Sequence, residues 1–201
     1  TVEQKIARVS LALKNIDRFL YSLFISVNRV PIMDARICPT LGVSIDTLYY
    51  NCNFVRELPL PQLVFIMEHE MYHLAMRHNS RRGSKHGVIW NLASDFYINK
   101  VLCEEYSIRP GSGVSMIEKD PLGVGIQFGE GGLYNELINT RVDTAESIYE
   151  ELMEEYNNQK NNQQSVAGSE LGESGQSSPG SMGSNEVGEG SESDGGSSST
   201  D

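Results

Sequence analysis

HEMYHLAMRH, residues 69–78, holds three of the four histidines in this 201-residue chain, and the fourth is His86. Within this stretch, His69 and His73 are four residues apart. Side chains at this spacing project from the same face of a helix, so the two imidazoles can bind one metal ion. The stretch therefore predicts a metal-binding helix, and the rest of the sequence has to supply the remaining ligand.

The surrounding segment predicts one long helix. It reads PLPQLVFIMEHEMYHLAMRHNSRRG over residues 59–83, with Pro61 suited to the first turn and Gly83 to the end. Glu70 lies about 100° around this helix from His69, within reach of a metal-bound water. The alternative is a chance match to a short motif on an ordinary amphipathic helix. The clean helix signals favour the metal site.

A zinc site of this kind needs a third protein ligand, and His78 is a poor candidate. The extended three-histidine motif places its last histidine six residues after the second and breaks the helix with a glycine. His78 follows His73 by five residues with no glycine between them. If the helix continues, His78 faces away from His69, toward the core, which predicts a structural or supporting role. His86 lies in a basic turn and is expected to be exposed.

Asp95 is a better third ligand. It lies in the predicted helix VIWNLASDFYINKVL (88–102), on the apolar face, with Asn91 and Asn99 four residues to either side. Buried polar groups of this kind are costly unless a partner satisfies them. An antiparallel return of the chain would bring Asp95 level with His73. The alternative is a carboxylate that hydrogen-bonds to the backbone or to one of the arginines of the preceding turn.

Two histidines, a carboxylate and an open position fit zinc best among the common metals. The predicted site is therefore Zn²⁺ bound by His69, His73 and Asp95, with Glu70 as the catalytic residue. Glu70 would activate a metal-bound water for attack on a peptide bond. A strand near TLYYNCNFV (47–55) could pair with an extended substrate, which makes a polypeptide the expected substrate.

The remaining periodicities predict an α+β fold that is mainly helical, with a small hairpin beside the metal-binding helix. Helices are expected over 3–27, 87–106 and 143–156, and a hairpin over 39–55. Asp143 and Glu146 occupy the positions of a capping box at the start of the last helix. Residues 107–140 carry no motif and are expected to form a long loop.

Composition separates a folded domain, residues 1–156, from a tail. Residues 157–201 are rich in Gly, Ser, Asn, Gln and Glu and predict a disordered acidic tail or linker. The net charge of −11 argues against a nucleic-acid partner, and no apolar run is long enough for a bilayer. The three cysteines form no metal pair or disulfide framework, which favours the cytoplasm.

Two segments carry a resemblance to a known family. LYYNCNFVRELPLPQLVFIMEHEMYHLAMRH (48–78), followed by WNLASDFYINKVL (90–102), resembles the metallopeptidase domain that precedes a VWA-like domain in bacterial and phage proteins. The residues that match its second helix are Trp90, Asn91, Ala93, Asp95, Ile98 and Asn99. The resemblance implies a zincin-like fold, with His69 and His73 as ligands and Glu70 as acid and base. It also implies a downstream VWA-like domain after the acidic linker.

Other interpretations stay open. The domain could be a catalytically weak or inactive zincin scaffold that serves as an interaction module in a larger VWA/ATPase-type assembly. It could also be a helical domain without a metal. The intact Glu70 favours the enzyme, because a scaffold can lose this residue while it keeps both histidines.

Overall fold

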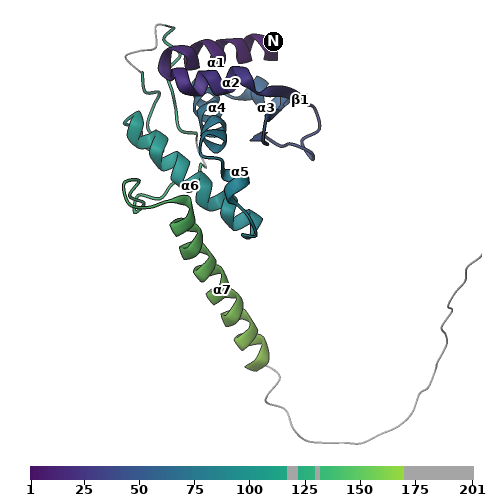
Figure 1. Ribbon diagram of the computed structural model, residues 1–201, viewed down its shortest axis with the longest axis vertical. Coiled ribbons are helices and arrows are strands. Elements are labelled where there is room, and N and C mark those ends of the chain that lie inside the picture. Colours follow the sequence, from purple (N-terminus) through teal and green to yellow (C-terminus); the bar gives the residue numbers. More distant parts are fainter. Residues whose placement is uncertain (117–121, 130–131, 170–201) are drawn as a thin grey trace, which may run out of the picture. The chain divides into compact units, whose positions relative to one another are not determined.

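The computed structural model describes residues 1–116, 122–129 and 132–169 (Figure 1). The chain divides into two compact units, Thr1–Asn161 and Asn162–Asp201. The first is an α+β unit that is mainly helical and carries a three-stranded sheet. Of the second, the structure describes helical backbone as far as Ser169. Among the described residues, no helix combines the length and apolarity that crossing a membrane requires.

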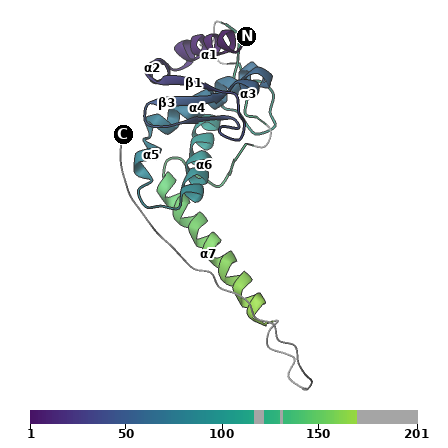
Figure 2. The ribbon, with the colours of Figure 1, turned by 90° about the vertical axis from the view of Figure 1, so that its right-hand side faces the viewer.

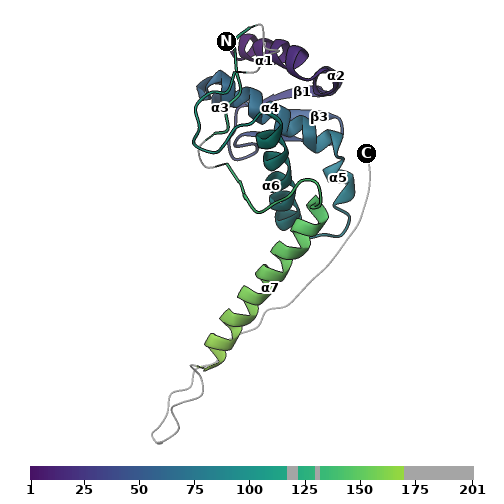
Figure 3. The same ribbon diagram turned by 90° about the vertical axis from the view of Figure 1, so that its left-hand side faces the viewer.

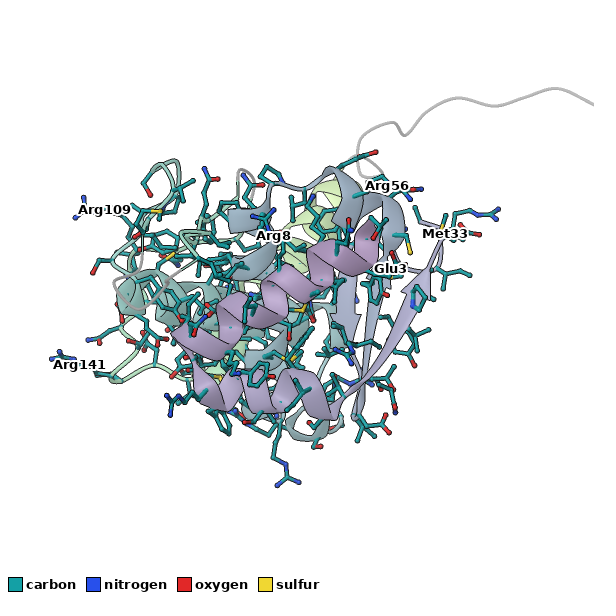
Figure 4. All side chains as sticks on the ribbon, turned by 90° about the horizontal axis from the view of Figure 1, so that it is seen from above. Glu3, Arg8, Met33, Arg56, Arg109 and Arg141 are labelled. Atoms are coloured by element: carbon teal, nitrogen blue, oxygen red, sulfur yellow. The ribbon has the colours of Figure 1, made fainter. Side chains whose placement is uncertain are left out.

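The first helical segment is two helices rather than the single helix predicted for residues 3–27. Helix α1 covers Val2–Ile16 and α2 covers Arg18–Ser26. Asp17 adopts extended backbone between them, and its carboxylate accepts from the first free N–H groups of α2. This aspartate ends one helix and caps the next. Figure 4 shows the two helices side by side, and they pack against each other.

The sheet contains β1 (Asn28–Ile32), β2 (Leu41–Val43) and β3 (Thr47–Asn51), in the order β1-β3-β2. Strands β2 and β3 form the antiparallel hairpin predicted within residues 39–55. Strand β1 pairs parallel to β3, which the sequence did not indicate. Figures 2 and 3 show the sheet alongside α4. The strand order makes β2 an edge strand, and β2 packs against α4.

The end of the predicted hairpin segment is helical. Helix α3 covers Cys52–Glu57, and Asn51 caps it by accepting from the N–H groups of Asn53 and Phe54. The apolar residues that made this segment resemble a strand serve to pack the helix, because Cys52 and Val55 are buried. The cap at Asn51 decides its helical backbone.

Helices α4 (Leu60–Ala75) and α6 (Gly87–Glu105) pack against each other and carry the two sequence motifs. The prediction of one helix that runs to Gly83 was wrong. Helix α4 ends at Ala75, and Arg77 takes a left-handed conformation with φ of 56°. A separate short helix, α5, follows over His78–Arg81. The direction of His78 therefore cannot be read from a continuous helical wheel.

Helix α7 covers Ala145–Ser169 and so continues beyond residue 156. The predicted capping box was wrong, because Thr144 and Ser147 make the reciprocal cap instead. Glu146 is bound to Arg81 of α5. The predicted tail beyond residue 169 lies outside the described residues.

The main core lies between α1, α2, α4, α6 and the sheet. Its fully buried members include Leu13, Leu20, Phe24, Leu48, Leu63, Met67, Met71, Ile98 and Leu102. Part of the predicted loop 107–140 joins this core through Ile126 and Phe128. The chain there is anchored to α4 by a hydrogen bond from Gln127 N–H to the Pro61 carbonyl. By contrast, Arg109 and Arg141 point away from the protein in Figure 4.

Candidate metal centre

Three donor atoms from α4 and α6 converge at one point. The Nε2 atoms of His69 and His73 lie 3.0 Å apart. Asp95 Oδ1 lies 3.4 Å from His69 Nε2 and 3.0 Å from His73 Nε2. The packing of α6 against α4 therefore brings all three residues together. Within the described part of the chain, they form a group whose spacing could hold a metal ion.

The bonding of these atoms fits a bound cation. Asp95 Oδ1 is buried and has no hydrogen-bond partner among the described residues, although two imidazole nitrogens lie close to it. In a tetrahedral site with ligands about 2.0–2.2 Å from the ion, ligand atoms are about 3.3 Å from one another. The three separations match this spacing. An ion among the three atoms would satisfy the orphaned oxygen.

The two asparagines that flank Asp95 hold the candidate ligands in place. Asn99 donates its Nδ2 hydrogen to the Leu133 carbonyl at 2.8 Å, so its Oδ1 accepts from His69 Nδ1, also at 2.8 Å. With the proton on Nδ1, His69 presents an unprotonated Nε2 to the centre. Asn91 Nδ2 donates to Asp95 Oδ2 at 2.9 Å, which leaves Oδ1 directed at the histidines. Such supporting hydrogen bonds fix the orientation of metal ligands.

Electrostatics favours an ionised Asp95. Burial would raise the pKa of its carboxyl, but the neighbouring His69 and His73 lower it to about 2. The arginines of the turn before α6, Arg81 and Arg82, were the alternative partners for Asp95. Neither is bound to it, and Arg81 is paired with Glu146 instead. A carboxylate that stays charged is the form that binds a metal.

Glu70 lines the same cleft as the three donor residues and is half-buried. Burial raises the pKa of its carboxyl and the charge of Asp95 adds to the effect, whereas the two histidines oppose it. The backbone of Val43 in the edge strand β2 also opposes the rise in the pKa of Glu70. A half-buried carboxyl with a raised pKa, close to a candidate cation site, is suited to accept and return a proton.

The cleft has a volume of about 530 Å³, and β2, α4, α6, Phe128, Gly129 and Gly132 contribute to its walls. Its described lining includes the apolar side chains of Phe54, Ile66 and Phe128. Phe128 packs edge-on against Phe65, with ring centroids 5.0 Å apart. Gly132 lacks a side chain where a Cβ would lie 2.5 Å from the Phe128 ring. The wall near Phe128 therefore depends on glycine at that position.

The other two histidines occupy different environments. His86 is exposed, as predicted, and its side chain caps α6. His78 is buried, as predicted, and it contacts a candidate ligand from behind, with its Nδ1 3.2 Å from His73 Nδ1. The continuous helix from which its direction was argued was wrong, because α4 ends at Ala75. Burial, and then the nearby His73 and Arg81, lower the pKa of His78 to about 4, so its ring is neutral at pH 7.

The sequence did not single out two groups that shape the edge of the cleft. Asn79, the second residue of α5, donates to the Val43 carbonyl at 3.2 Å and so connects β2 to α5. Val43 is an ordinary strand residue, and its role comes from backbone atoms alone. No side-chain pattern could have indicated it.

The fold and the site define a class: an α+β domain in which a His-Glu-x-x-His helix and the next helix bring two imidazoles and a carboxylate together beside a glutamate. A sequence model of the family described as "Putative metallopeptidase domain" matches residues 3–201. The chain belongs to this family. No curated protein and no solved structure matches it. The family description supports a protease function in general and implies a metal.

Proposed function

We propose that this protein is a zinc-dependent metallopeptidase with a zincin-like arrangement of its catalytic helix. The observation that supports it most directly is the convergence of His69 Nε2, His73 Nε2 and Asp95 Oδ1 beside Glu70, in a cleft open to an edge strand. Two imidazoles and one carboxylate with an open position are a ligand set typical of catalytic zinc.

The three ligands and their supports would hold the ion in the cleft. When bound, zinc supplies a Lewis acid that polarises the scissile carbonyl and lowers the pKa of a water at its open position. His69 and His73 keep their Nε2 lone pairs directed at the centre, and Asp95 contributes a negative charge. All three lie on helices rather than loops, which limits their movement.

Glu70 carries the proton transfers in this proposal. One of its carboxylate oxygens accepts the proton of the attacking water, and the same carboxyl returns it to the leaving amine nitrogen. The raised pKa of Glu70 helps the first step, because a more basic carboxylate takes the proton of the water more readily. Glu70 and Val43 of strand β2 line the same cleft.

The substrate in this proposal is a polypeptide in extended conformation. Strand β2 is an edge strand of the sheet, and its residues Leu41, Gly42 and Val43 line the cleft. An exposed edge can accept a further strand by main-chain pairing. The apolar lining at Phe54, Ile66 and Phe128 favours an apolar side chain next to the cleaved bond. The residues after 156 would act as a linker to a VWA-like partner domain.

The test compares Glu70→Gln with wild type after both are loaded with zinc. We expect one zinc per chain in each and a fall in peptide cleavage of about 10²–10⁴-fold in the variant. Glu57→Gln is the matched control, because Glu57 is an exposed glutamate on α3. Equal cleavage by wild type and Glu70→Gln would refute the proposed mechanism.

Zinc content separates the remaining interpretations. Stoichiometric zinc that is lost in His69→Ala, without cleavage by wild type, would favour the inactive scaffold. Wild type with no zinc would favour a helical domain without a metal.

A further inference from the structure

Resting on the proposed zinc site, we propose that His78 is a positioning residue for the ligand His73. Its Nδ1 accepts a hydrogen bond from His73 Nδ1–H and so holds His73 in the tautomer that presents Nε2 to the centre. The extended three-histidine motif does not assign His78 this role, because His78 lies one residue too early for that motif and no glycine separates it from His73. It supports the ligand His73 and does not itself bind the metal.

The geometry of the two rings supports this contact. The Nδ1 atoms lie 3.2 Å apart, and the rings meet edge to face with centroids 5.1 Å apart and planes at 79°. Only one of two facing imidazole nitrogens can carry the proton in a hydrogen bond. Because His73 Nε2 faces Asp95 Oδ1 and His69 Nε2, a metal-binding His73 must carry its proton on Nδ1. His78 Nδ1 is then the acceptor.

The surroundings hold His78 in this orientation. The left-handed Arg77 turns the chain after α4, so that His78 folds back beside His73 rather than continuing along the helix. Trp90 of α6 donates its indole N–H to the His78 carbonyl at 2.9 Å, and its ring stands edge-on to the imidazole. His78 is 2% exposed, so water does not compete for the contact.

With Nδ1 as the acceptor, the neutral His78 ring carries its proton on Nε2. Nε2 is buried and has no hydrogen-bond partner among the residues that the structure describes. The contact with His73 is thus the one hydrogen bond recorded there for the His78 ring. His69 is supported in a different way, by the Asn99 amide oxygen. The two ligands are held from behind by two separate groups.

A matched pair of variants tests the acceptor. Asparagine Oδ1 is attached to Cγ, as Nδ1 is in histidine, and leucine has the same branching without a polar atom. We therefore expect His78→Leu to lower zinc affinity about 10–100-fold, measured by competition with a chromophoric chelator. His78→Asn should recover most of this loss. Replacing the exposed His86 by the same two residues should change the affinity less than about threefold.

The outcomes separate this inference from the proposed function. If His78→Asn and His78→Leu bind zinc equally well, whether like wild type or equally weakly, the positioning role is refuted while the zinc site stands. Wild type without stoichiometric zinc would refute the site itself and this role with it.

A measurement on wild type covers the case in which His78→Leu fails to fold. Nitrogen-detected NMR of the zinc-loaded protein should show a protected proton on His73 Nδ1, with scalar coupling to His78 Nδ1 across the hydrogen bond. A proton on His78 Nδ1, or no coupling between the two nitrogens, would overturn the assignment.

Discussion

Glu68 lies next to the first histidine of the motif, yet its side chain is fully buried in the main core. Its Oε1 accepts from the Tyr106 hydroxyl at 3.0 Å, while Oε2 has no hydrogen-bond partner in the described part of the chain. Burial raises the pKa of Glu68 to about 8, opposed by Tyr106 and reinforced by the charges of Glu105 and Asp17. The residue is therefore protonated in the folded protein at neutral pH.

This raised pKa predicts that Glu68 destabilises the fold as pH rises. Below pH 4.5, the ordinary pKa of glutamate, Glu68 is protonated in both the folded and the unfolded chain. It then adds no pH dependence to the free energy of unfolding. Between pH 4.5 and about 8 only the unfolded chain releases it, so the free energy of unfolding falls by about 1.4 kcal/mol per pH unit. Glu68→Gln should abolish this contribution.

Urea denaturation of wild type and Glu68→Gln at pH 5, 6, 7 and 8 measures the effect. The stability of the variant relative to wild type should increase steadily over this range. Glu57→Gln, at an exposed position, should show no such trend. A constant difference between wild type and Glu68→Gln would mean that Glu68 is already ionised in the folded protein.

Individual site residues differ in how well the sequence indicates them. Asp95 could be predicted as a neighbour of the histidines because a polar group on an apolar helix face requires a partner. His78 could not be placed, because its direction depends on the left-handed Arg77, a backbone choice with no glycine to signal it. The roles of these residues in binding a metal stay predictions.

At the scale of elements, the division between α1 and α2 depends on one side chain. Asp17 Oδ1 accepts from Phe19 N–H at 2.7 Å and from Leu20 N–H at 2.9 Å. Apolar residues continue at helical spacing on both sides, so the pattern alone predicts one helix. The aspartate is a strong N-cap, and its own preference outweighs continuation of the helix.

Replacing Asp17 by alanine should therefore lower the free energy of unfolding by about 1 kcal/mol, within the usual range of about 0.5–2 kcal/mol for a lost N-cap. Asp17→Asn keeps an oxygen acceptor and should stay within about 0.5 kcal/mol of wild type. Guanidinium denaturation followed by circular dichroism gives both values. A stable, unchanged Asp17→Ala would mean that packing of α2 alone fixes the break.

Elements with strong periodicity could be predicted, and those set by a single cap or a distant partner could not. The sequence indicated α6 and the β2–β3 hairpin, because both rely on local patterns. Strand β1 has an exposed or half-exposed pattern, and its strand form depends on parallel pairing with β3, about twenty residues away. Helix α3 depends on the Asn51 cap within a segment of strand-like composition.

At the scale of the whole molecule, the candidate metal centre and its supports belong to one unit. All of the ligands, the cleft lining and the described core residues lie in Thr1–Asn161. Helix α7 is attached to this unit near its start, through Glu146 to Arg81 and through the Tyr149 hydroxyl, which accepts from His86 N–H at 3.0 Å. The family match extends to residue 201, beyond this unit.

These attachments predict that a chain ending at Asn161 keeps the fold and the metal centre. Its free energy of unfolding should stay within about 0.5 kcal/mol of the full chain, and its Tm within about 2 °C. A chain ending at Thr144 is the contrasting control, because it removes α7 and uncovers the small core cluster around Ala93 and Ile138. That control should lose about 2 kcal/mol or more of its free energy of unfolding, since the apolar contacts that α7 makes with this cluster are lost.

Calorimetry and zinc content measured on all three chains give the result. A loss of more than about 2 kcal/mol on truncation at Asn161, or loss of zinc, would show that residues 162–201 contribute to the stability of the metal-site unit.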